Sequence, residues 1–208
     1  MTTNNLHFAQ LGITSGKLWL LKYPNLITSF TTANDYLGFH QNYRALVLQQ
    51  NNMISERMQI TNELDAINTE IRTSIKFVKG YLAEFYGNNA KSYYLAYGLV
   101  FENNKHIIAK DNDKRMLALD ILVKALQDSS NLLSSQKYGL SYWSAIQVQH
   151  RAVWTSAKTL DGTISINSAN LKQMKGQAIV LQKSLRAQIR VDFATNYKSV
   201  IRDFGFQD

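Results

Sequence analysis

Residues 86–99 read YGNNAKSYYLAYGL, and residues 193–206, which lie 107 positions later, read FATNYKSVIRDFGF. Four residues are identical, and they are Asn89, Lys91, Ser92 and Gly98 in the first stretch and Asn196, Lys198, Ser199 and Gly205 in the second. The pattern indicates a tandem duplication. It retains packing positions and a helix-terminating glycine, and it contains no nucleophile, metal cage or phosphate loop, so it reports on architecture rather than on chemistry.

The same offset extends upstream without a gap. It predicts internal repeats at residues 36–99 and 143–206, joined by residues 100–142, within a single helical domain over residues 1–208. Only eight of the 64 aligned positions are identical, so the interpretation depends on the matching register of apolar residues. In the first repeat these residues recur at steps of three and four from Phe39 to Phe85, and the second repeat keeps this phase from Ile146 to Leu185. Such a 3.5-residue period is typical of long helices packed as a coiled coil.

The predicted fold is therefore all-α. A single proline, Pro24, interrupts the chain, and strand-like alternation is absent, so more than two-thirds of the residues should be helical and no sheet should form. The specific prediction is an antiparallel hairpin of two long helices, residues 36–85 and 143–193, with a small helical lobe at each end, because short returns between helices are the rule.

Several helix boundaries can be predicted as well. Asn34 and Asp35 are candidate N-caps of the first long helix, a shorter helix is expected over residues 114–127, and Gly98 and Gly205 should terminate short helices. The alternative is a compact up-and-down bundle in which the long helices break near residues 54–61 and 161–168. The Asp-Gly-Thr run at residues 161–163, which is poor helix material, supports this alternative.

Composition narrows the class of protein. The chain is 45% apolar, which is enough to build a core, and it has no cysteine, so disulfides and thiolate chemistry are excluded. No apolar run approaches the roughly 18 residues of a membrane span, and the first residues do not have the pattern of a signal peptide. A cytoplasmic protein without a membrane segment is expected.

No catalytic, cofactor-binding or metal-binding residues are predicted, and no cofactor. The four histidines are not spaced to share a metal ion, and neither a nucleophile elbow nor a glycine-rich phosphate loop is present. An enzyme is therefore not expected. A cluster of eight aromatic residues is interpreted as the core of a small lobe rather than as a stacking surface; its members are Phe77, Tyr81, Phe85, Tyr86, Tyr93, Tyr94, Tyr97 and Phe101.

The charge pattern carries the one candidate site. No acidic residue occurs between Gly162 and Val191, whereas five basic residues do, and these are Lys172, Lys175, Lys183, Arg186 and Arg190. At 100° per residue they form a stripe about 80° wide on one helix, away from the apolar seam. They are the candidate polyanion-binding residues. The alternative is a solvated face that Glu56 on the other long helix partly neutralises.

The leading functional hypothesis is a non-catalytic structural or protein-interaction protein, and the second is a nucleic-acid or polyanion binder that uses the basic stripe. Self-association is expected, most simply as a homodimer, because a two-helix pair leaves apolar residues without cover. These residues are Val47, Ile54, Trp154 and Ile166.

Overall fold

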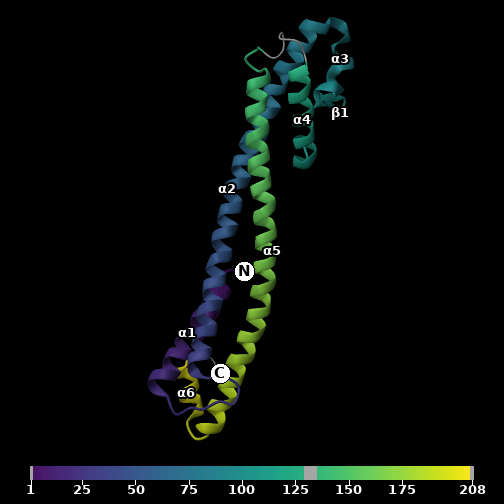
Figure 1. Ribbon diagram of the computed structural model, residues 1–208. Helices are drawn as coiled ribbons and strands as arrows, with labels where there is room; N and C mark the ends of the chain where they lie inside the picture. The colour runs from purple at the N-terminus through teal and green to yellow at the C-terminus, as the bar shows by residue number, and fades with distance from the viewer. Residues whose placement is uncertain (1, 129–134, 207–208) are drawn as a thin grey trace. The chain divides into compact units, whose positions relative to one another are not determined.

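The computed structural model describes residues 2–128 and 135–206, and 82% of these residues are helical, which confirms the all-α class. The helices in chain order are α1 (Thr2–Lys22), α2 (Ala33–Tyr86), α3 (Ala90–Tyr93), α4 (Asn112–Asp128), α5 (Leu140–Asp192) and α6 (Tyr197–Asp203), as Figure 1 shows. Two short 3-10 turns, η1 (Gly87–Asn89) and η2 (Tyr94–Tyr97), flank α3.

Helices α2 and α5 are unbroken over 54 and 53 residues. The predicted bounds were correct to within three residues at each end. The alternative with a break near residues 161–168 is wrong, because Gly162 lies inside α5. One interior glycine costs only about 1 kcal/mol, and the burial of Ala157, Asn167 and Leu171 on the same helix offsets that cost.

The N-terminus of α2 is capped by Thr32, not by Asn34 or Asp35 as predicted. The Thr32 hydroxyl oxygen accepts a hydrogen bond from the backbone N–H of Asp35 (3.1 Å), and the hydroxyl donates to the Asp35 carboxylate (2.7 Å). Asp35 thus lies at the third helical position and completes a capping box. At α4 the expected aspartate cap is present, since Asp111 Oδ1 accepts from the backbone N–H of Lys114 (3.0 Å).

Both predicted C′ glycines are confirmed. Gly98 has φ 73° and Gly205 has φ 79°, in the left-handed region. The backbone N–H of Leu99 donates to the Tyr94 carbonyl, and that of Phe206 donates to the Ile201 carbonyl. These are 6→1 bonds of the Schellman type, which satisfy carbonyls that the helix end leaves free.

The prediction that no sheet forms is wrong in one place. Strands β1 (Val100–Glu102) and β2 (Lys105–Ile107) pair antiparallel, with Phe101 opposite His106. Asn103 and Asn104 connect them, with φ of 51° and 60°, as a type I′ turn requires. Strands of three residues are too short to produce a readable alternating pattern.

The chain divides into two compact units, the first unit comprising Met1–Glu56 with Asp161–Asp208 and the second unit Arg57–Leu160. Within the first unit, α2 and α5 run antiparallel, because Tyr36 shares a core cluster with Ile189 whereas Val47 shares one with Leu171. Within the second unit the same orientation follows from the Ser74 and Tyr142 hydroxyls, which lie 2.7 Å apart.

Each unit has its own core. In the first unit α1 and α6 cover the long helices, with Trp19, Tyr36 and Phe204 fully or almost fully buried. In the second unit α4 and the segment after α2 do so, with Leu82 and Leu119 at the centre.

Contacts inside the first unit recur inside the second unit at an offset of 107 residues. A Cβ atom added at Gly205 would meet the Leu11 side chain, and one added at Gly98 would meet the Ala118 backbone. Asn5 Oδ1 accepts from Lys175 Nζ (2.9 Å), and Asn112 Oδ1 accepts from Asn68 Nδ2 (3.2 Å). In both comparisons each residue is replaced by the one 107 positions away. Helix α4 is therefore the counterpart of α1.

Candidate interaction surfaces

The five residues of the predicted basic stripe lie on α5 in the first unit, but they do not form one free surface. Lys172, Lys183 and Arg190 are exposed, whereas Lys175 and Arg186 are half-buried. The Arg186 guanidinium lies 4.9 Å from the centroid of the Phe206 ring, and that of Arg190 lies 5.9 Å from the Tyr197 ring. These cation–π contacts help to attach the C-terminal segment to α5. Glu56 has no printed ion pair with Lys172, so neutralisation by Glu56 finds no support.

The aromatic cluster is only partly a core. Tyr97 is buried, and Tyr81, Tyr86 and Tyr94 pack against the core of the second unit. Phe101, in contrast, is 66% exposed on the surface of β1. The core interpretation is wrong for Phe101, because the hairpin turns this residue away from the helices that bury the others.

An apolar groove of about 640 Å³ runs between β1 and α4 in the second unit. Five of its lining residues are large, apolar and exposed, and they are Leu95, Val100, Phe101, Leu117 and Ile121. Exposed apolar residues that occur singly are ordinary, but a contiguous group of them marks a contact surface. Sequence reasoning missed this group because its members come from three elements that are adjacent only in the fold (Figure 1).

The counterpart surface of the first unit is polar. Residues 107 positions away from Leu95, Leu117 and Ile121 are Arg202, Gln10 and Thr14, all of which are exposed. The same backbone framework is therefore stable with polar side chains at these three positions. The apolar residues of the second unit are not needed to build the framework.

Strand β1 also offers unpaired backbone groups beside this groove. Glu102 and Lys105 flank the two-residue turn, so this pair exchanges hydrogen bonds, and the next pair, Phe101 with His106, does not. The backbone N–H and C=O of Phe101 consequently point away from β2. Neither group has a printed backbone partner among the described residues. Such an edge is a template for pairing with another strand.

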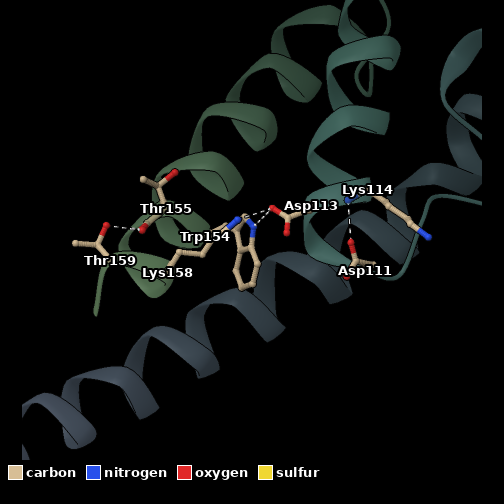
Figure 2. A network of polar contacts seen from close by, with 7 residues as sticks. All are labelled: Asp111, Asp113, Lys114, Trp154, Thr155, Lys158 and Thr159. Atoms are coloured by element: carbon tan, nitrogen blue, oxygen red, sulfur yellow. Dashed lines mark hydrogen bonds and ion pairs between the residues drawn. The ribbon is translucent and has the colours of Figure 1, made fainter. Parts of the chain in front are cut away.

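A polar network attaches α4 to α5 in the second unit (Figure 2). Trp154 Nε1 donates to Asp113 Oδ1 (2.8 Å), and Lys158 Nζ lies 3.1 Å from the same oxygen. The indole hydrogen bond, followed by that of the Lys158 ammonium, lowers the pKa of the Asp113 carboxyl.

Two histidines are completely buried, one in each unit. His40 lies among aromatic rings, including those of Phe8 and Tyr36, and neither of its ring nitrogens has a printed hydrogen-bond partner. Burial lowers its pKa to about 4. For His150, burial and then the charge of Arg115 lower the pKa to about 4. Both imidazoles are therefore neutral at pH 7.

The apolar residues expected to need a dimeric cover differ in their surroundings. Val47 is buried against α1 of the same chain, and Trp154 is half-buried. Ile54 and Ile166 are exposed. The argument for self-association through the long helices is thus wrong for Val47, because α1 supplies its cover.

Among residues 2–128 and 135–206, no group of three or more histidine or carboxylate side chains is placed to hold a metal ion. No helix in this part of the chain is long and apolar enough to cross a membrane. Comparison with protein-family models, with curated proteins and with solved structures finds no match.

Proposed function

We propose that this protein is a non-catalytic, self-associating helical scaffold, built by duplication of a unit of about 107 residues and specialised for association in its second half. The observation that carries the proposal is the exposed apolar groove beside β1, whose counterpart surface in the first unit is polar. Selection for stability alone does not explain why one of two equivalent surfaces exposes leucine and phenylalanine.

The proposed occupant of the groove is a second copy of the chain. Phe101 is the middle residue of a three-residue strand, so its free N–H and C=O can pair with those of Phe101 in another copy around a twofold axis. The polar residues lining the groove are balanced, since Lys110 and Lys114 accompany Glu102 and Asp111. Two copies can therefore approach here without strong local repulsion, although the chain carries a net charge of +8.

Replacing Phe101 by Glu and Leu117 by Gln should convert the dimer to a monomer. The double variant places a charge at the centre of the proposed interface and removes an apolar side chain, so the dissociation constant should rise at least about 100-fold. Sedimentation equilibrium at tens of micromolar protein measures this change. Both residues are exposed, so circular dichroism should show unchanged helix content.

The matched control is Gln10→Glu with Thr14→Glu, which alters the counterpart surface of the first unit and should leave the dimer intact. A wild-type protein that remains monomeric at these concentrations would refute self-association. A dimer that survives the Phe101→Glu and Leu117→Gln changes would show that the interface lies elsewhere.

Polyanion binding is the second candidate function. It is favoured by the exposure of Lys172, Lys183 and Arg190 in a stretch that lacks acidic residues from position 162 to 191. Arg186 does not belong in its test, because its guanidinium packs on Phe206.

Replacing Lys183 and Arg190 by Gln should weaken binding to duplex DNA and reduce the slope of log K against log salt by about 1.8, because each lost phosphate contact contributes about 0.9. Fluorescence anisotropy over a salt series measures the slope. The control is Lys76→Gln, since Lys76 is the counterpart of Lys183 in the second unit. Wild-type protein without salt-sensitive binding would eliminate this candidate.

A further inference from the structure

A second groove, of about 610 Å³, lies in the first unit between α1, α2 and α5. Val47, Ile54 and Leu171 form its apolar wall. This volume is within the range of small-molecule sites, which combine apolar walls with a few convergent polar groups.

Gln50 supplies a buried acceptor in this groove. The side chain is 6% exposed, and its Nε2 donates to the Ser168 hydroxyl (2.9 Å) and the Ile164 carbonyl (3.3 Å). The carbonyl can only accept, so the amide orientation is fixed and Oε1 is the remaining atom. Oε1 is buried and has no hydrogen-bond partner. A buried acceptor without a partner is costly, and a ligand with an N–H or O–H group would satisfy it.

The groove is also cationic. Lys172 and Lys175 line it, and no acidic residue does. Lys175 Nζ is held by Asn5 Oδ1 at 2.9 Å, which is a neutral partner. The two ammonium groups therefore remain available to an anion.

The second unit shows what occupies the counterpart region there. The counterpart of Val47 is Trp154, whose indole N–H donates to the Asp113 carboxylate, and Lys158 lies beside the ring at 5.6 Å from its centroid (Figure 2). The counterparts of Gln50 and Lys172 are Ala157 and Asp65. An indole ring with a paired N–H thus occupies the region in the second unit, whereas the smaller Val47 leaves a groove in the first unit.

We propose that the groove of the first unit binds an aromatic carboxylate of about the size of an indole that carries an N–H donor. The ring lies against Val47, Ile54 and Leu171. The N–H donates to Gln50 Oε1, and the carboxylate contacts the ammonium groups of Lys172 and Lys175. The ligand supplies to the first unit what Trp154 and Asp113 supply to the second. This site is independent of the self-association proposed above.

The chemistry can come from a free indole acid or from a tryptophan at the carboxyl terminus of a peptide. Titration of the full ¹⁵N-labelled chain with indole-3-acetate and with N-acetyltryptophan, followed by NMR, tests both sources. At least one acid should give saturable shifts centred on Gln50 and Lys172, and the tighter of the two identifies the source. The neutral analogues, indole-3-acetamide and N-acetyltryptophanamide, should bind about tenfold more weakly, because they cannot form charge-assisted hydrogen bonds.

Three variants take residues from the counterpart positions. Lys172→Asp and Gln50→Ala should each weaken binding about tenfold, and Val47→Trp should abolish it by filling the groove. Because Val47 is buried and its replacement can perturb folding, the exposed Lys172 carries the decisive test. Lys183→Gln, on the same helix outside the groove, should have no effect. Absence of saturable shifts, shifts centred on the second unit, equal binding of acid and amide, or unchanged binding by Lys172→Asp would each overturn the proposal.

Discussion

Lowering the pH from 7 to 4 is expected to reduce the free energy of unfolding by about 6 kcal/mol. His40 and His150 are buried and uncharged in the fold, each with a pKa of about 4 in place of the ordinary value of 6.5. At 1.36 kcal/mol per unit of pKa difference, each histidine contributes about 3 kcal/mol. The effect is large compared with the 5–15 kcal/mol that usually separates folded from unfolded chains.

The sign follows from proton uptake. Between pH 6.5 and 4 the unfolded chain binds protons at both imidazoles and the folded chain does not, so stability is fully present above pH 6.5 and falls as the pH decreases towards 4. The carboxyls of Asp113 and Asp203 have pKa values lowered below 3.8 by hydrogen bonds from Trp154 and Lys22, respectively. Their contributions are lost at still lower pH and do not affect this window.

Urea unfolding at several pH values measures this dependence. The double variant His40→Gln and His150→Gln should lose most of the slope between pH 6.5 and 4. Glutamine is a reasonable replacement for His40, since Gln147 is its counterpart in the second unit. A wild-type stability that does not change between pH 7 and 4 would contradict the assignment.

Gly98→Ala should cost about 4 kcal/mol of unfolding free energy, the second large effect. A Cβ atom at this position would lie 2.3 Å from the carbonyl oxygen of Ala118 on α4, and the residue has φ 73°. The left-handed conformation alone costs about 1–2 kcal/mol for a residue with a side chain, and forcing α4 away from the Schellman turn adds about 1–3 kcal/mol.

Gly205→Ala provides the matched control in the first unit. Its φ is 79°, but the added Cβ would lie 3.1 Å from the flexible end of Leu11 rather than against backbone. The expected cost is therefore only the conformational 1–2 kcal/mol. Chemical denaturation of the two variants separates the steric term from the conformational term, and equal losses would contradict the close approach at Gly98.

Much of this fold can be predicted from the sequence because its determinants are local and repeated. The 3.5-residue period gives both long helices to within three residues, since a 50-residue pattern contains many independent observations. Gly98 and Gly205 are predictable for a different reason, because only glycine readily adopts the C′ conformation. Thr32 was missed as the cap of α2, since Asn34 and Asp35 are also good cap residues and compete with it in the same four-residue window.

The equivalence of α1 and α4 could not be predicted. Between them only Asn5 and Lys17 are retained, as Asn112 and Lys124, and two matches in 21 residues are not distinguishable from chance. What the two helices share is a pattern of burial and the contacts with Gly205 and Gly98. Those contacts become visible only when the elements are packed.

The two grooves were not predictable for a related reason. The apolar groove combines residues from η2, β1 and α4, and the cationic groove combines residues from three helices, so neither forms a motif along the chain. Lys172 and Lys175 were found through the absence of acidic neighbours. Their partner Gln50 was not, because an amide on a long helix is unremarkable until its oxygen is known to be buried without a donor.

The division of the chain into units has a consequence for synthesis on the ribosome. The second unit is a continuous segment, whereas the first unit joins residues 1–56 to residues 161–208. At about 5–20 residues per second, α1 emerges on the order of ten seconds before the residues that complete its unit. During this interval Trp19 and Ser15 lack Phe204 and the rest of α6, which they contact in the folded protein. The second unit can fold as it is made, and the first unit must wait until translation is nearly complete.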